Sequence, residues 1–237
     1  MRVERVLDHE EMSRRACAVV VAEVRTKPGL LLGVATGDTP TRTYERLAEV
    51  RIEEPALFDH CLILALDEWL GLPPGHPASC QSYLREKLLG PLRIPVSRYR
   101  GFRAQAKDPE AECRRMSRWL GRSGPMDVCI LGLGRNGHLL MNEPGAALSY
   151  APHRARLAES TRRHSMLTSA KTAPRFGLTL GLADVLQARR ILLLVSGRQK
   201  RLPLRRMLAG QVSAACPASF LWLHGDVTVY CDRAAAP

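Results

Sequence analysis

The sequence is poor in aromatic side chains and contains no apolar run long enough to cross a bilayer. Aromatics make up 5% of its 237 residues, too few for an obvious base-stacking surface, although the net charge of +12 raises nucleic acid as a partner. A membrane span needs about 20 apolar residues, and the charged start, residues 1–5, is unlike a signal peptide. The arginines are spread along the chain without a basic tract. We therefore expect neither a membrane nor a nucleic-acid partner, but an arginine-rich surface that attracts anionic metabolites.

Cysteine pairs with the spacing of a redox or zinc motif are also missing. The seven cysteines are an odd number and lie far apart, at Cys17, Cys61, Cys80, Cys113, Cys129, Cys216 and Cys231. No C-x-x-C pair and no Cys/His cluster with zinc spacing occurs. This pattern predicts buried structural thiols in a reducing, cytoplasmic protein with no metal site.

Hydrophobic residues are 46% of the chain and charged residues 24%, as in a folded protein, and the length fits one domain spanning residues 1–237. Four continuous apolar segments are typical of strands in a parallel sheet covered on both faces. They are residues 30–35, 61–66, 126–131 and 191–195, and two later runs, 220–223 and 227–230, also resemble strands.

Helical patterns alternate with these segments. They cover residues 10–25, 40–50, 109–120 and 200–209, with Thr39 as the expected N-cap of the second and Pro40 at its first position. The alternation predicts an α/β fold, a doubly wound, mostly parallel, Rossmann-like sheet with helices on both faces. Residues 145–176 have the weakest pattern and are rich in Arg and His, which predicts an irregular active-site lid.

Reactive side chains follow each of the four apolar segments. Ligands of open α/β sheets bind beyond the carboxyl ends of the strands, so these residues are expected to meet. The first turn, Thr36-Gly37-Asp38-Thr39-Pro40, suits a phosphate, because a glycine lets the backbone approach and a helix N-terminus follows. Lys200 adds a positive charge. An ordinary turn and a solvated lysine are the alternatives.

Asp67 directly follows six apolar residues. Desolvation at such a position raises the pKa of a carboxyl group toward that of a general base, and an N-cap or surface turn is the alternative. The neighbouring Glu68 is expected to point elsewhere.

His138 lies in a glycine-rich loop, and Glu143, five residues later, can orient its ring. The three glycines of this loop echo a dinucleotide fingerprint. That motif belongs at the first strand, with an acidic residue about 20 positions later, so a nicotinamide cofactor is not expected.

These blocks resemble the superfamily of glucosamine-6-phosphate deaminases and 6-phosphogluconolactonases. The matching segments follow the family's order and are residues 35–40, 66–69, 131–138, 142–145, 178–181 and 195–200. The GxGxxGH…NEPG block is specific to the amino-sugar branch. Within that branch Asn136 and the stretch Pro217–His224 are most similar to galactosamine-6-phosphate isomerases, which convert galactosamine 6-phosphate and water to tagatose 6-phosphate and ammonia.

The resemblance implies a role for each matching residue. Asp67 corresponds to the base that moves a proton between C2 and C1, His138 to the histidine that assists ring opening, and Glu143 to the carboxylate that orients it. Asn136 replaces an aspartate of the glucosamine enzymes beside this histidine. The implied phosphate-binding residues are Gly37, Asp38, Thr39 and Lys200, and the implied substrate-binding residues are Thr36 and Gly137. Neither step requires a cofactor or metal.

Two positions depart from the family pattern. Asp38 stands where relatives have a small residue, so its backbone N–H is expected to bind phosphate while its carboxylate turns away. Leu167 stands where the glucosamine enzymes carry a phosphate-binding arginine in the lid. Four nearby arginines are candidates to replace that arginine, and the sequence does not choose among Arg154, Arg156, Arg162 and Arg163.

Three other functions stay open. The first is glucosamine-6-phosphate deaminase, whose substrate differs only in configuration at C4. The second is 6-phosphogluconolactonase, a hydrolase on the same scaffold. The third is a sugar-phosphate-sensing domain that binds without turnover. The sequence does not indicate the oligomeric state.

Overall fold

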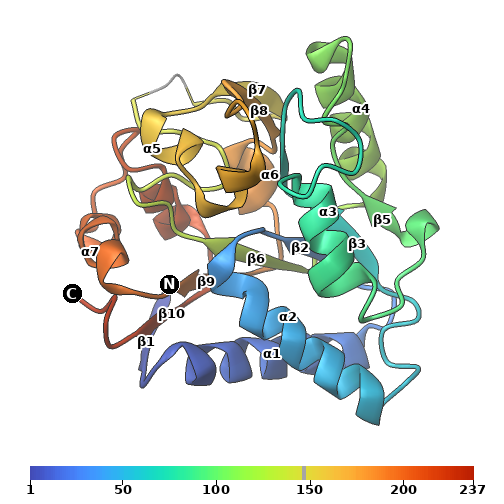
Figure 1. Ribbon diagram of the computed structural model, residues 1–237. Helices are drawn as coiled ribbons and strands as arrows, with labels where there is room; N and C mark the ends of the chain where they lie inside the picture. Colours follow the sequence, from blue (N-terminus) through green and yellow to red (C-terminus); the bar gives the residue numbers. More distant parts are fainter. Residues whose placement is uncertain (146–147) are drawn as a thin grey trace.

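A computed structural model describes residues 1–145 and 148–237, so positions 146 and 147 of the predicted lid lie outside the described residues (Figure 1). The strands are β1 (Arg2–Val6), β2 (Leu31–Val34), β3 (Leu62–Ala65), β4 (Asp67–Trp69), β5 (Tyr99–Arg100), β6 (Val128–Gly132), β7 (His153–Arg156), β8 (Phe176–Thr179), β9 (Arg190–Val195) and β10 (Val227–Asp232). The α-helices are α1 (His9–Thr26), α2 (Asp38–Glu53), α3 (Cys80–Leu84), α4 (Pro109–Ser123), α5 (Glu159–Arg162), α6 (Leu182–Leu186) and α7 (Arg201–Leu208). The other helical segments are η1 (Arg85–Leu89), η2 (Val96–Arg98), η3 (Ser165–Ser169), η4 (Arg198–Lys200) and η5 (Pro217–Leu223).

The main sheet has seven strands in the order β1-β10-β9-β6-β2-β3-β5, and all its pairs are parallel. The chain builds outward from β2 through β3 to β5 and then returns to place β6 on the other side of β2. The strand order therefore reverses between β2 and β6. In open α/β sheets such a reversal leaves a crevice at the carboxyl ends of the two strands.

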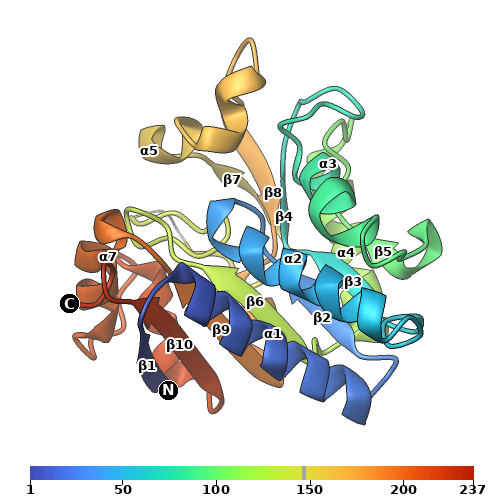
Figure 2. The same ribbon diagram turned by 60° about the horizontal axis from the view of Figure 1, so that its bottom comes forward.

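Successive residues of the central strands enter two different cores, which is why their sequences are continuously apolar. Leu32 and Val34 of β2 pack with α1 and α2 on one face, whereas Leu31 packs toward the face covered by α4, α6 and α7. Figure 2 shows α1 and α2 side by side in front of the sheet. The predicted doubly wound α/β fold is confirmed.

Three details differ from the sequence-based expectations. Residues 220–223 belong to the 3₁₀ helix η5 rather than to a strand, because Pro217 starts the turn and Trp222 Nε1 donates to the carbonyl of Met207 at 2.8 Å. A short apolar run carries no periodicity that separates these states. The N-cap of α2 is Gly37 and not Thr39, because the glycine at φ 107° turns the chain directly into the helix.

The predicted lid is also more regular than expected, since it contains β7, α5 and η3. β7 joins β8 and β4 in a small antiparallel sheet of order β4-β8-β7. Because β4 starts one residue after Leu66, the predicted base Asp67 belongs to this second sheet and pairs with Thr179. In Figure 2 the segment carrying β7 and α5 stands above the main sheet. A lid position over the cleft described below stays a prediction.

Candidate active site

A cleft of about 380 Å³ lies at the carboxyl ends of four adjacent strands, β9, β6, β2 and β3. Residues that follow all four strands line it. Among the predicted site residues, those that line the cleft are Thr36, Gly37, Asp38, Thr39, Asp67, His138 and Lys200. Asn136 and Glu143 lie behind His138, and Gly137 faces Cys216, with its Cβ position 3.0 Å from that sulfur. The structure thus brings the candidate base, histidine and lysine to one cavity.

One end of the cleft is formed by the Gly37 turn and Lys200. Gly37 caps α2 without a side-chain hydrogen bond, so the first N–H groups of this 16-residue helix have no capping side chain. Such groups favour an anion. Lys200 Nζ donates to the carbonyl of Leu133. Burial, with the positive charge of Arg135 nearby, lowers the pKa of Lys200 to about 8. An anion bound here would favour the charged form of Lys200, which burial disfavours.

The neighbouring predicted residues are held by protein partners. The Asp38 carboxylate accepts a hydrogen bond from Ser165 Oγ at 3.1 Å, which joins α2 to the lid. The carbonyl of Thr39 accepts from His9 Nε2 at 2.8 Å. The Thr36 hydroxyl donates to the thiol of Cys80 at 3.5 Å. The side chain of Thr36 is therefore linked to the surroundings of Asp67, whose Oδ1 atom the same thiol contacts.

Asp67 lies on the cleft wall with little hydrogen-bonding support. Burial, followed by the charge of Glu68, raises the pKa of Asp67 to about 7, against a smaller lowering by the Cys80 thiol, which donates to Oδ1 at 3.8 Å. Glu68 is buried and turned away, as expected, and accepts the backbone N–H groups of Trp69, Cys80 and Gln81, each at 2.9 Å. A carboxyl group with a pKa near 7 can both accept and return a proton at neutral pH.

His138 is held from behind by a buried carboxylate. Its Nδ1 lies 3.3 Å from Glu143 Oε2, and Asn136 Nδ2 donates to the same oxygen at 2.8 Å. Burial opposes ionisation of Glu143, but the hydrogen bonds from His138, Thr161 and Asn136 outweigh it and lower the pKa of Glu143 to about 2. An ionised Glu143 can only accept, so Nδ1 of His138 carries the proton. The neutral ring then has its free lone pair on Nε2, the nitrogen available for proton transfer.

The loop needs a glycine at position 134 because the ring of His138 packs directly against it. A Cβ atom at Gly134 would lie 2.3 Å from Cδ2 and 2.4 Å from Nε2 of His138. Any side chain there would displace the ring. Gly134 therefore makes room for the imidazole.

The predicted lid segment contributes cleft residues that the sequence did not indicate. Thr161 and His164 line the cavity, and Thr161 Oγ1 lies 3.2 Å from Nδ1 of His138. The abundance of Arg and His in the segment was a usable signal, but it directed attention to the arginines. Of the four candidate arginines only Arg163 lines the cleft, whereas Arg154 stacks over Phe176 at 4.7 Å from the ring centroid.

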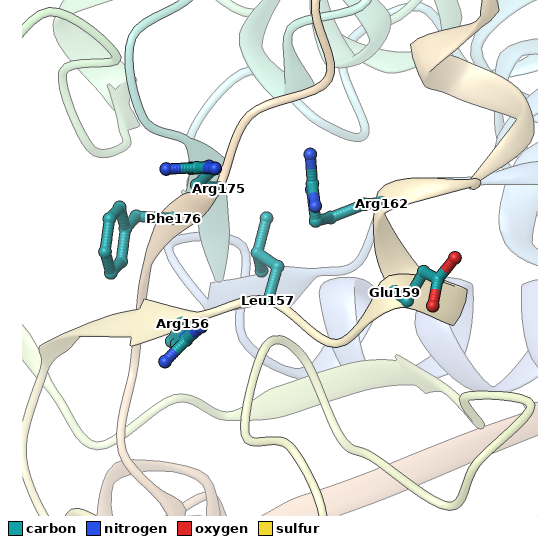
Figure 3. A pocket seen from close by; sticks show the side chains of 6 residues that line it. All are labelled: Arg156, Leu157, Glu159, Arg162, Arg175 and Phe176. Atoms are coloured by element: carbon teal, nitrogen blue, oxygen red, sulfur yellow. The ribbon is translucent and has the colours of Figure 1, made fainter.

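Arg156 and Arg162 line a separate cavity of about 560 Å³ together with Leu157, Glu159, Arg175 and Phe176 (Figure 3). Figure 3 shows Arg162 and Arg175 directed into the same space above Leu157, while Arg156 points the other way. Arg156 and Arg175 are exposed. None of the predicted catalytic residues belongs to this cavity, whereas Asp67 and His138 line the cleft of about 380 Å³.

Within residues 1–145 and 148–237, no three His, Cys, Asp or Glu side chains are grouped so that they could hold a metal ion. No helix in the same two ranges combines the length and apolarity that crossing a membrane requires. All seven cysteines are buried free thiols.

The fold and cleft define an α/β protein with candidate acid–base groups and a glycine turn before a helix N-terminus at the carboxyl edge of its sheet. Residues 8–230 match the family described as glucosamine-6-phosphate isomerases/6-phosphogluconolactonase, and the chain belongs to this family.

Similar proteins cover nearly the whole chain. AgaI of Escherichia coli (strain K12), which bears the provisional name of a deaminase, is 39% identical over 94% of this chain and 89% of its own length. Glucosamine-6-phosphate deaminase 1 of Bacillus subtilis (strain 168) is 37% identical over 100% of this chain and 98% of its own. A solved structure of a monomeric glucosamine-6-phosphate deaminase superimposes with a TM-score of 0.95 at 37% identity, covering 99% and 98% of the two chains. A 6-phosphogluconolactonase from Trypanosoma brucei, at 22% identity and a TM-score of 0.76, shares the fold.

Proposed function

We propose that this protein isomerises and deaminates an amino sugar 6-phosphate, and that galactosamine 6-phosphate is its substrate, with tagatose 6-phosphate and ammonia as products. One observation carries the proposal. Asp67, with a pKa near 7, and His138, with a fixed tautomer, line one cleft that also contains an anion seat formed by the Gly37 turn and Lys200. A hexose 6-phosphate needs an anchor at C6 and proton transfer at its other end, so the arrangement suits this substrate class.

Binding begins at the phosphate. The free N–H groups at the start of α2 and the ammonium group of Lys200 hold the phosphate and direct the sugar ring toward the other strand ends. His138 then acts on the closed ring. Its free Nε2 accepts the proton of the C1 hydroxyl and returns it to the ring oxygen as the C1–O5 bond breaks, which leaves an open-chain aldehyde. Glu143 stabilises the imidazolium that forms transiently.

Asp67 performs the isomerisation. Its carboxylate removes the proton from C2 of the open-chain sugar, and the electron pair forms a cis-enolamine as the C1 carbonyl oxygen accepts a proton from the ammonium group at C2. The carboxylic acid then returns its proton to C1, so that the nitrogen at C2 becomes an iminium ion. Water adds to C2 and gives its proton to the nitrogen, and the C2–N bond breaks to give the ketose and ammonia, which leaves in its protonated form. The pKa of about 7 suits a group that must take and return one proton in each cycle.

The preference for the galactosamine substrate rests on two sequence features, Asn136 and the stretch Pro217–His224, which resemble the galactosamine enzymes. Asn136 here shares Glu143 with His138, so the charge behind the histidine is that of one carboxylate. Glucosamine 6-phosphate is the second candidate. The observation that favours it is the identity of two relatives, each 37% identical to this chain, which are glucosamine-6-phosphate deaminases.

A substrate comparison tests the proposal. Purified protein is supplied with galactosamine 6-phosphate, glucosamine 6-phosphate and 6-phosphogluconolactone, and release of ammonia or acid is followed. We expect ammonia from the galactosamine substrate with a kcat/KM at least about tenfold above that for the glucosamine substrate, a difference of about 1.4 kcal/mol. The reverse order would assign the second candidate. Acid from the lactone alone would make the protein a lactonase, and binding without turnover would make it a sensor.

A further inference from the structure

His164, at the start of the lid helix η3, directs one edge of its ring at the Gly37 turn. A Cβ atom built on Gly37 would lie 3.5 Å from both Cε1 and Nε2 of this imidazole. His164 and Gly37 line the same cleft, and the histidine comes from a segment more than a hundred residues away along the chain. The turn that we propose to bind phosphate is therefore faced by a lid side chain.

The hydrogen bonds of His164 determine which nitrogen carries the proton. The backbone N–H of Met166 donates to Nδ1 at 3.2 Å, so Nδ1 is an acceptor. The neutral ring must then carry its proton on Nε2, the nitrogen on the Gly37 side. The ring of Trp69 packs against the imidazole, with the centroids 6.2 Å apart and an interplanar angle of 45°, and restricts its rotation. His164 thus presents a fixed N–H donor to the turn.

Burial, more than the nearby charges, favours the neutral form of the His164 ring. Burial lowers the pKa of His164, and Lys200, His138 and Arg135 act in the same direction, against the opposing effect of Asp38. A bound dianion at the turn would add negative charge beside Nε2 and strengthen the hydrogen bond. The link between Ser165 and Asp38 holds the lid close to the turn.

We propose that His164 donates its Nε2–H to the phosphate of the substrate, as the lid's contribution to a seat completed by the start of α2 and Lys200. The inference rests on the proposed function of this cleft. Two neighbouring side chains fit the role less well. Arg163 is 76% exposed and pairs with Glu159, and Leu167 is buried and apolar. We infer that His164 takes the phosphate-binding role that the resemblance assigns to a lid arginine in the glucosamine enzymes.

A pair of substitutions separates the two nitrogens. The amide nitrogen of glutamine in His164→Gln can occupy the place of Nε2, whereas asparagine in His164→Asn reaches only the place of Nδ1. Binding of inorganic phosphate is measured by calorimetry, and KM and kcat are measured with the amino sugar phosphate. We expect His164→Asn to weaken phosphate binding and raise KM by about tenfold, the value of one hydrogen bond to a charged group, with kcat within about twofold. His164→Gln should lie within about threefold of the native protein.

His153→Leu, in β7 and outside the cleft lining, is the matched control and should bind phosphate as the native protein does. Thermal unfolding of each variant verifies that it is folded. Unchanged phosphate binding in folded His164→Asn would overturn the inference, as would equal losses in the Asn and Gln variants. Because phosphate binding needs no turnover, the inference and the proposed activity fail separately. If the protein released no ammonia but His164→Asn still weakened phosphate binding, the role of His164 in phosphate binding would stand and the proposed enzymatic activity would be wrong.

Discussion

Two carboxyl groups contribute to the cleft, and their surroundings differ most in the supply of hydrogen-bond donors. Asp67 lines the cavity, and its Oδ1 atom receives one long hydrogen bond, from a thiol at 3.8 Å. Glu143 lies behind the histidine, where Asn136, His138 and the N–H of Ala158 surround it. Glu143 is buried, and Asp67 is half-buried in the cleft wall. Burial raises the pKa of Asp67 to about 7, whereas the donors around Glu143 reverse that effect and lower its pKa to about 2.

The difference teaches how one cleft keeps one carboxyl group reactive and another permanently charged. Desolvation, together with the charge of Glu68, makes Asp67 an acid that exchanges its proton at neutral pH, and desolvation with several donors makes Glu143 a fixed anion. Glu68 shows that neighbours in sequence need not share a role, because its backbone donors turn it away from the cavity. In our proposal Asp67 transfers protons, and Glu143 orients the histidine and stabilises its imidazolium form.

The largest expected effect comes from removing the exchangeable carboxyl group. Asp67→Asn leaves no base to take the C2 proton, so kcat for ammonia release should fall by about a thousandfold, within the range measured for general bases. Binding of inorganic phosphate, measured by calorimetry, should stay within about threefold of native, because the seat lies at other strand ends. A variant with native kcat would remove Asp67 from the mechanism.

Removing the fixed anion should have a smaller effect. Glu143→Gln keeps the shape but no longer determines the tautomer of His138, and we expect kcat to fall by about 10- to 100-fold, less than for the base because opened sugar also forms without assistance. The measurement is the same ammonia assay. Gly134→Ala is a second way to disturb the histidine, since its Cβ would overlap the ring. If neither variant slowed turnover, ring opening would not involve His138.

The position and raised pKa of Asp67 could be predicted from the sequence more fully than the surroundings of Glu143. Asp67, Lys200 and the Gly37 turn follow apolar strands, and the carboxyl ends of neighbouring parallel strands share one edge, so their convergence follows from the pattern. The desolvation that raises the pKa of Asp67 follows from the same pattern. The assignment of Glu143 came from a motif, and the number of its donors depends on the folded loop.

Side-chain contacts between segments far apart in the chain could not be predicted from the sequence. The thiol of Cys80 reaches Asp67 and Thr36 only because α3 packs beside the end of β3. The orientation of His164 depends on a backbone N–H two residues later and on the packing of Trp69. The run 220–223 was mistaken for a strand because four apolar residues fit a strand and a 3₁₀ turn equally well.

Replacing the two carboxyl groups by amides should change the free energy of unfolding in opposite directions. The pKa of Asp67 is raised on folding from 3.8 to about 7, so its ionisation opposes folding above pH 3.8, and the full cost, about 4 kcal/mol, is present above pH 7. Asp67→Asn should therefore raise the free energy of unfolding at pH 8 by about 2 kcal/mol, since the amide is also desolvated, with little gain at pH 3.5.

Glu143→Gln should do the opposite. The pKa of Glu143 is lowered from 4.5 to about 2, so its stabilisation is complete above pH 4.5 and is lost as the pH falls through 2. We expect this variant to lose about 2 kcal/mol at pH 8 in urea unfolding, roughly the cost of breaking a buried charged network. Equal signs for the two variants would contradict the contrast between them.

The smallest effect should come from the one donor that reaches Asp67. The Cys80 thiol lowers the pKa of Asp67 slightly, so Cys80→Ala should raise it further and move the acid limb of the kcat/KM profile upward by about half a pH unit, the value of a weak hydrogen bond. At pH 6 turnover should fall by about threefold and at pH 9 remain native. Cys80→Ser, whose shorter hydroxyl is a stronger donor, is the matched variant and should leave the limb unchanged or lower. A Cys80→Ala profile that superimposes on the native one would mean that the thiol does not contribute and that burial and the charge of Glu68 set the pKa of the base, in full contrast to the donor-rich Glu143.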